Sequence, residues 1–274
     1  MATYRGRCVH RIPDGIHDPG AETSAPVTTP GRTLVFDFDG TVSLGDGPVL
    51  RYAHHVAETL PGDDARTRFA AAVAAGLRDI GRPHGAIDGY ALVQGLAARH
   101  EVPERLLSAA FLASRAELGG PHAPVVAPAG LGCFLRGLEG RAIRVLVTNS
   151  PAVRIPEALA ALGIAGAFDE VVTGAGKPAG MGAVLDRLDP GPAAGPPAAR
   201  LLSVGDLWVN DLEPAHARGF RTALVGPAAS ADDRATYRAA TVAGLYADIR
   251  AWLDGTPSPA TSSLAAPHGK QTHA

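Results

Sequence analysis

Short, almost wholly apolar runs recur along the chain and predict buried strands. The clearest runs stand at 33–36 (TLVF), 143–147 (IRVLV), 201–204 (LLSV) and 222–225 (TALV), with a weaker one at 170–172. Apolar runs of this length are typical of parallel strands that are covered on both faces. Segments with apolar residues at helical spacing separate them, at 130–139, 152–162, 181–188 and 211–218. This alternation predicts an α/β fold with a doubly wound parallel sheet.

The stretch between residues 45 and 128 has a different pattern, with apolar residues at helical spacing and no strand-like run. It predicts helices at 48–60, 63–80, 86–100 and 103–118. This insert leaves the chain where the first strand ends, so it would cover the crevice in which open α/β sheets bind ligands. We therefore expect a core formed by residues 32–44 and 129–254 and an all-helical cap domain formed by residues 45–128.

The two ends of the chain show neither pattern. Residues 1–31 are rich in Pro, Gly, Thr and Ser, and residues 255–274 have a similar composition. Segments of this kind bury too little apolar surface to fold. We expect both to be disordered tails.

Charge and composition narrow the class of partner. The chain has 274 residues, with 25 basic and 27 acidic side chains, and this balance does not suggest a protein that binds nucleic acid. No apolar run approaches the ~18 residues that a membrane span needs, and no apolar segment of a secretory signal stands near the start. The two cysteines, Cys8 and Cys133, are too few for a disulfide framework. We expect a cytoplasmic protein, a monomer or homodimer, whose partner is a small molecule.

Lysine is rare in this sequence. Only Lys177 and Lys270 are lysines among the 25 basic residues, and only Asn149 and Asn210 are asparagines. An exposed loop is the ordinary place for a lysine such as Lys177. In a chain that otherwise uses arginine, however, its retention suggests a demand for a compact ammonium group rather than a planar guanidinium.

Polar side chains follow the predicted inner strands at the points where they end. These are Asp37 and Asp39 in DFDGT, Thr148 and Asn149 in TNS, and Asp206 and Asp211 in GDLWVND. Because the carboxyl ends of parallel strands meet at one edge of a sheet, these side chains and Lys177 would share one crevice. Each also has an ordinary alternative, since Asp-Gly forms turns and Ser, Asn and Asp cap helices.

The chemistry of this set favours a metal-assisted reaction. Clustered carboxylates are unfavourable without a cation, and hard oxygen ligands with open positions suit Mg²⁺. The hydroxyl of Thr148, nearby backbone N–H groups and the ammonium of Lys177 suit a phosphoryl group. The residues therefore predict Mg²⁺-assisted phosphoryl transfer.

Taken in order, DFDGT (37–41), TNS (148–150), Lys177 and GDLWVND (205–211) resemble the four motifs of the haloacid dehalogenase (HAD) superfamily. The resemblance covers residues 33 to about 253. The separation of the first two motifs is similar to that of the phosphatase branch with a helical cap of the first type, which includes phosphoglycolate phosphatases. The resemblance implies a Mg²⁺-dependent hydrolase of phosphate esters.

Roles follow from the resemblance, residue by residue. It implies that Asp37 is the nucleophile that forms an aspartyl-phosphate and that Asp39 is the general acid and base. The groups that would bind the phosphoryl oxygens are Thr148, Asn149 and Lys177. The groups that would hold Mg²⁺ are Asp37, the backbone carbonyl of Asp39, Asp206 and Asp211.

Three functions stay open at this point. The dehalogenases of the family lack a carboxyl group two residues after the nucleophile, so Asp39 favours a phosphatase that acts on a small phosphorylated metabolite. A phosphomutase acting on a sugar phosphate and a non-catalytic HAD-like regulatory or binding protein are the alternatives.

Several side chains could touch the substrate. In the cap these are Arg51, His54, His55, Arg82 and His84, although each is more simply part of a solvated helix face. Trp208 could line the pocket or pack beneath the cap.

Overall fold

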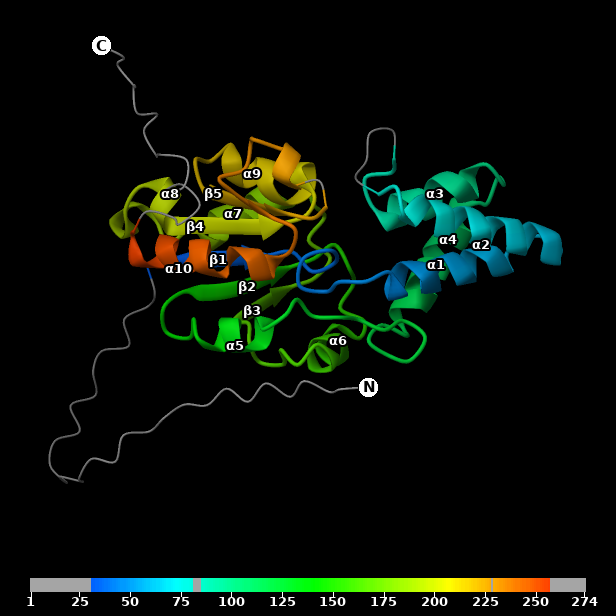
Figure 1. The fold of residues 1–274 in the computed structure, drawn as a ribbon, viewed down its shortest axis with the longest axis horizontal. Helices are drawn as coiled ribbons and strands as arrows, with labels where there is room; N and C mark the ends of the chain where they lie inside the picture. The colour runs from blue at the N-terminus through cyan, green and yellow to red at the C-terminus, as the bar shows by residue number, and fades with distance from the viewer. Residues whose placement is uncertain (1–30, 81–84, 228, 257–274) are drawn as a thin grey trace, which may run out of the picture.

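The computed structural model describes residues 31–80, 85–227 and 229–256, and within them a six-stranded sheet forms the centre of the fold (Figure 1). Every pair of neighbouring strands is parallel, in the order β3-β2-β1-β4-β5-β6. The strands are β1 (Thr33–Phe36), β2 (Ile143–Val147), β3 (Glu170–Val172), β4 (Leu201–Gly205), β5 (Arg221–Val225) and β6 (Tyr237–Ala239). The doubly wound α/β fold that the sequence predicts is confirmed.

Helices cover both faces of this sheet. One face packs against α5 (Leu131–Arg136), α6 (Ile155–Ala161) and α10 (Tyr246–Asp254). The other face packs against α7 (Met181–Leu188) and α9 (Glu213–His216), while α8 (Pro197–Arg200) leads into β4. Burial on both sides explains why β1 and β4 are apolar at nearly every position.

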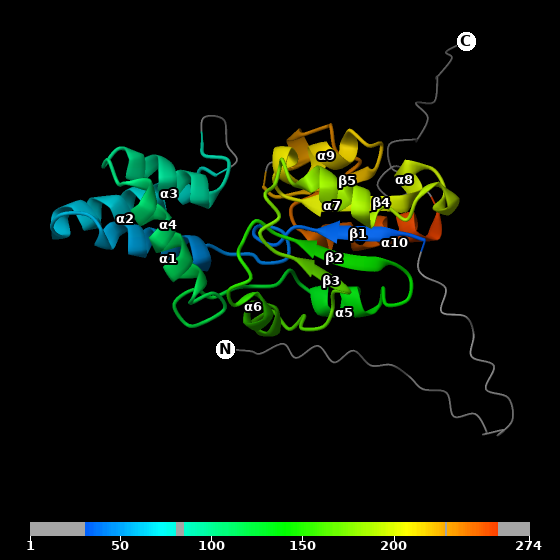
Figure 2. The same cartoon turned by 180° about the vertical axis from the view of Figure 1, so that it is seen from behind.

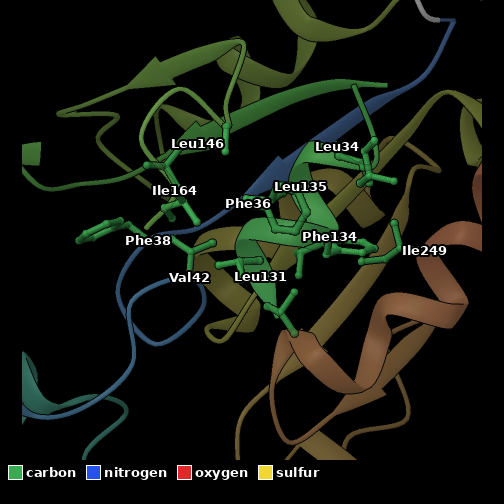
Figure 3. Packing of buried hydrophobic residues seen from close by; sticks show 14 of the residues in the cluster. Leu34, Phe36, Phe38, Val42, Leu131, Phe134, Leu135, Leu146, Ile164 and Ile249 are labelled. Atoms are coloured by element: carbon green, nitrogen blue, oxygen red, sulfur yellow. The ribbon is translucent and has the colours of Figure 1, made fainter. Parts of the chain in front are cut away.

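Alternate residues of the strands divide between the two apolar layers. Leu34 and Phe36 of β1 point towards α5 and α10, where they meet Leu131, Phe134 and Ile249 (Figure 3). Val35 faces the opposite way, into the layer of α7 and α9. The side-chain period of two along a strand thus fixes the register of the whole core.

Four helices are inserted between β1 and α5: α1 (Gly47–Glu58), α2 (Asp63–Leu77), α3 (Gly89–Ala98) and α4 (Glu104–Arg115). We call residues 47–115 the helical insert. It has its own apolar core, built around Tyr52, Val56, Phe69 and Val93. Both views place it beyond the carboxyl ends of the strands (Figures 1 and 2). An insert in this position can close the crevice at that edge of the sheet.

Two elements of the core differ from the sequence prediction. The helix expected at 211–218 is a π-helical turn at Trp208–Leu212 followed by the short α9, and the edge strand β6 was not expected at all. The backbone N–H of Asp211 bonds to the carbonyl of Leu207 at 2.9 Å, so the chain turns before α9 begins. Strand β6 reads Tyr-Arg-Ala and is only partly buried, so it lacks the apolar run that marks the inner strands.

The predicted tails, 1–31 and 255–274, lie outside the described residues except at Gly31, Gly255 and Thr256. Gly255 ends α10 in a left-handed conformation, and the N–H of Thr256 bonds to Ala251. Of the helices that the structure describes, none has the length and apolar character that crossing a membrane requires.

Candidate active site

A buried lysine links two aspartates at the carboxyl edge of the sheet. Asp37 directly follows β1, and Lys177 lies in the loop after β3. The Lys177 Nζ donates hydrogen bonds to Asp37 Oδ1 at 2.6 Å, to Asp211 Oδ1 at 2.7 Å and to the carbonyl of Val147 at 3.1 Å. All three charged side chains are buried. This lysine holds the predicted nucleophile in a fixed orientation.

Three carboxylates converge beside that lysine. One oxygen each from Asp37, Asp206 and Asp211 can be chosen so that all lie within 4.8 Å of one another. Burial and the charge of Asp211 raise the pKa of Asp37 to about 7 even though Lys177 acts in the opposite direction. Burial and the charge of Asp37 likewise raise the pKa of Asp206 well above its usual range. One lysine does not balance three carboxylates, and these donors fit a hard divalent cation such as Mg²⁺.

Two glycines leave the space that these carboxylates occupy. A Cβ atom on Gly40 would lie 2.2 Å from Asp206 Oδ2, and one on Gly205 would lie 2.3 Å from the Cβ of Asp211. Gly40 also has a φ of +82°, which side chains rarely adopt. The glycine of DFDGT and the glycine of GDLWVND are therefore required by close packing around the carboxylates.

Asp39 is not part of this group of carboxylates and pairs with other residues. Its Oδ2 accepts hydrogen bonds from Arg115 Nη2 at 2.8 Å and from Ser150 Oγ at 3.3 Å. Its Oδ1 accepts from the Tyr90 hydroxyl at 3.3 Å and from Arg115 Nη1 at 3.4 Å. The side chain therefore lies between the second motif of the core and the helical insert, where it can meet a group that enters between them.

Thr148 and Asn149 are neighbours in the sequence, but their side chains make different contacts. Thr148 is buried at the end of β2, lines the cavity and accepts the N–H of Ser150 at 3.0 Å. The Asn149 side chain accepts the backbone N–H of Lys177 at 2.6 Å and donates to the Lys177 carbonyl at 3.0 Å. Its amide thus holds the lysine loop in place.

A cavity of about 1250 Å³ lies between the core and the helical insert. All seven predicted site residues line it: Asp37, Asp39, Thr148, Asn149, Lys177, Asp206 and Asp211. The helical insert contributes mainly apolar side chains to the opposite wall, namely Val49, Leu77, Ile80, Ile87 and Phe111. The cavity has room for more than a phosphoryl group.

Of the cap candidates, Arg51, His54 and His55 lie in the described part of the chain, and none of these three lines the cavity. Arg51 and His55 pair with Glu117 at 2.7 and 2.8 Å, and His54 pairs with Glu58 at 3.2 Å. Arg82 and His84 lie outside the described residues. Trp208 lines the cavity, which is one of its two expected places, and its ring packs against the guanidinium of Arg234 in the core.

Sequence reasoning missed Arg115 and Tyr90. Arg115 is the last residue of α4 and is only 2% exposed. Its position repeats the helical spacing of Leu107 and Phe111, which pack against the core of the insert. A cation in the line of apolar residues along α4 was the signal, because a buried arginine requires a specific partner.

The comparisons with known proteins bear on the fold. No family model matches the sequence, and no curated protein matches it either. Among solved structures, the chain is similar to YfnB from Bacillus subtilis, described as a HAD-hydrolase bound to magnesium, with a TM-score of 0.53 and 16% identity over 80% of this chain and 98% of that one. It is also similar to a HAD family hydrolase from Deinococcus radiodurans with bound phosphate and sodium, with a TM-score of 0.50 and 19% identity over 84% of this chain and 99% of that one. Together with the motif order, these likenesses show that the chain has the fold of the HAD hydrolases.

Proposed function

We propose that this protein is a Mg²⁺-dependent phosphatase that hydrolyses a small phosphorylated metabolite through an aspartyl-phosphate. The observation that carries the proposal is the arrangement around Lys177, which joins Asp37 to Asp211 while Asp39 pairs with Arg115 in the same cavity. A nucleophile, a charge-balancing cation and a separate acid/base group are the parts that phosphoryl transfer through a covalent intermediate needs.

The reaction proceeds in two steps on these residues. Asp37 forms a bond to phosphorus while the bond from phosphorus to the leaving oxygen breaks, and Asp39 donates a proton to that oxygen. A water molecule then attacks the phosphorus of the aspartyl-phosphate and gives a proton to Asp39. Orthophosphate leaves, and the carboxylate of Asp37 is restored.

The remaining groups hold the phosphoryl oxygens. Lys177 is 2.6 Å from Asp37, and the hydroxyl of Thr148 lines the same cavity. Donors that are fixed before the substrate arrives stabilise the developing charge most effectively. Asn149 contributes through the backbone of Lys177, whose position it fixes.

The acidic group Asp37, Asp206 and Asp211, together with the backbone carbonyl of Asp39, would hold Mg²⁺. When bound, the ion supplies positive charge that lets the carboxylates coexist with a phosphate dianion. The magnesium in the Bacillus subtilis structure and the phosphate in the Deinococcus radiodurans structure are in keeping with this assignment.

A phosphate-release assay tests the proposal. The purified protein is incubated with p-nitrophenyl phosphate and a panel of phosphorylated metabolites, with Mg²⁺ or with EDTA, and free phosphate is measured. We expect release that needs Mg²⁺ and that Asp37→Asn reduces by about 10³-fold or more. Asp63→Asn changes an exposed aspartate of α2 and serves as the matched control.

Other outcomes separate the alternatives. Isomerisation of a sugar phosphate with little release of phosphate would identify a phosphomutase instead. Full activity of Asp37→Asn would contradict the mechanism. Folded protein that is inert towards the whole panel would favour a non-catalytic binding function.

A further inference from the structure

The cavity wall formed by the helical insert carries one buried cation among the residues that the structure describes. Arg115 is 2% exposed and lines the cavity, whereas Arg78, the other arginine that the insert contributes to the lining, is on the surface. A buried guanidinium keeps its charge at every accessible pH. Burying such a charge without a compensating group is strongly unfavourable.

The compensating charge for Arg115 comes from the core and not from the helical insert. Arg115 forms an ion pair with Asp39 of the core at 2.8 Å and donates a hydrogen bond to the Tyr90 hydroxyl at 2.7 Å. The Nε atom is buried and has no hydrogen-bond partner in the described part of the chain. Arg115 therefore has more donors than the protein itself uses.

Aromatic rings hold the guanidinium in place. It lies 5.0 Å from the ring centre of Tyr90 and 5.1 Å from that of Phe111. Contacts of this kind fix the plane of the group and leave its edge for hydrogen bonds. The planar edge suits a carboxylate or another compact anion, which can accept two parallel bonds.

The contact with Asp39 shows how close Arg115 lies to the proposed site of reaction. Asp39 touches Ser150 of the second motif and Arg115 of the insert through the same oxygen, Oδ2. If the proposed function is correct, Asp39 also meets the ester oxygen of the substrate. A group bound by Arg115 would then lie only a few bonds away from that oxygen.

We propose that Arg115 is a specificity-determining residue that binds a second anion, carried by the leaving group of the phosphate ester close to the ester oxygen. The inference rests on the proposed function. The incoming anion replaces Asp39 as the partner of Arg115, which frees Asp39 to face the ester oxygen. The apolar side chains around Arg115 make it the anchor for an otherwise small leaving group.

Binding of non-hydrolysable phosphonates tests the inference without relying on turnover. Calorimetry in excess Mg²⁺ compares two matched pairs: phosphonoacetate with ethylphosphonate, and 3-phosphonopropionate with propylphosphonate. In at least one pair, we expect the carboxylate to bind about 30-fold more tightly than its uncharged partner, the typical effect of a buried charge pair. Equal affinities within both pairs would overturn the inference.

Variants then assign the preference to Arg115. Arg115→Met should abolish it while leaving the affinity for the uncharged phosphonates within about twofold, and Arg115→Lys should retain only part of it. Arg51→Met alters a partly buried insert arginine that pairs with Glu117 outside the cavity and should leave the preference intact. A preference that survives in Arg115→Met would contradict the assignment.

The outcomes distinguish this inference from the proposed function. If neither orthophosphate nor any phosphonate binds with Mg²⁺, the phosphate site itself is wrong and both proposals fail. If the alkylphosphonates bind and the carboxylate brings no gain, only the role of Arg115 is wrong. If Arg115→Met weakens both members of a pair equally, the residue acts through Asp39 and not on a second anion.

Discussion

At the scale of single residues, three carboxylates and one ammonium determine the character of the site. Lys177 donates to both Asp37 and Asp211, while Asp206 stands beside them without a bond to the lysine. Burial raises the pKa values of all three aspartates, and neighbouring carboxylates raise those of Asp37 and Asp206 further. In the metal-free protein this arrangement is therefore a source of instability, and a divalent cation would relieve it.

Replacing Asp206 should expose that instability directly. Asp206→Asn removes one of the mutually repelling carboxylates, so we expect the metal-free variant to melt at a higher temperature than the metal-free wild type. The same change removes a ligand, so Mg²⁺ should no longer raise the melting temperature. Thermal unfolding with EDTA and with Mg²⁺ measures both effects, and an unchanged Mg²⁺ response would show that Asp206 does not bind the metal.

A second prediction at this scale concerns the contact between Asn149 and the lysine loop. Both polar atoms of the Asn149 side chain bond to the backbone of Lys177, so Asn149→Ala should let the lysine loop shift. A displacement of about 1 Å in such a site lowers activity by roughly 100-fold. We expect kcat to fall by about that factor while the melting temperature changes little, because Asn149 is exposed. A normal kcat would mean that the loop is held by other contacts.

At the scale of elements, the strand ends and the turns after them bring the site together. Strand β1 leads directly into Asp37, and the turn that follows must be tight enough to bring Gly40 against Asp206. The π-helical turn after β4 brings the carboxylate of Asp211 back to the backbone N–H of Leu207, at 3.1 Å. The order of strands reverses between β1 and β4, the position at which open α/β sheets bind their ligands.

Gly40 offers a test of this close packing. Gly40→Ala would place a Cβ atom 2.2 Å from Asp206 Oδ2 and displace that carboxylate, so we expect loss of the Mg²⁺ response and of activity. Gly140→Ala is the matched control, since Gly140 has a φ of +72° and nothing lies within 4 Å of an added Cβ. The control should lose about 1 kcal/mol of stability from backbone strain and keep its activity. Similar activities for the two variants would contradict the packing argument.

The sequence predicted the strands and helices that are marked by a pattern among residues close together in the chain. The bounds of β1, β2 and β3 follow from apolar runs that end at a polar residue, and the four insert helices follow from their apolar spacing and from Pro and Gly between them. Strand β6 escaped notice because an edge strand is only half-buried. The π-helical turn escaped notice because the close approach of Asp211 to Gly205 that accompanies it is visible only in the folded chain.

In the candidate site, too, the sequence did not reveal contacts that form only when the chain folds. Residues at strand ends could be grouped from sequence because parallel strands place their ends together. Arg115 could not be assigned, because its pairing with Asp39 spans 76 positions and depends on how the helical insert packs over the core. Conversely, His55 and Arg51 looked available in the sequence, yet the fold pairs both with Glu117.

At the scale of the whole molecule, stability should depend on pH in an unusual direction when metal is removed. Asp37 has a pKa raised from 3.8 to about 7, so the folded state binds more protons than the unfolded chain between these values. The stability that this group contributes is present below about pH 4 and is lost as the pH rises through 7. The raised pKa values of Asp206 and Asp211 act in the same direction.

We therefore expect the melting temperature in EDTA to fall between pH 5 and pH 8, and the increment produced by Mg²⁺ to grow over the same range. Each ~1 kcal/mol corresponds to about 2–4 °C in a protein of this size. The pKa of Lys177 is raised, so the stability that it contributes is fully present below its unfolded pKa of 10.5 and does not change with pH in this window. Asp206→Asn should flatten the slope. A melting temperature in EDTA that rises across this range would contradict the electrostatic description of the site.

The most direct test of phosphoryl transfer at this site is chemical trapping of the intermediate. Protein mixed with Mg²⁺ and a hydrolysable phosphate ester is quenched in acid and treated with borohydride, which reduces an acyl phosphate to an alcohol, and the modified residue is located by peptide mass spectrometry. We expect homoserine at position 37, dependent on both substrate and Mg²⁺. Turnover with modification at another residue, or with none at Asp37, would contradict the central claim.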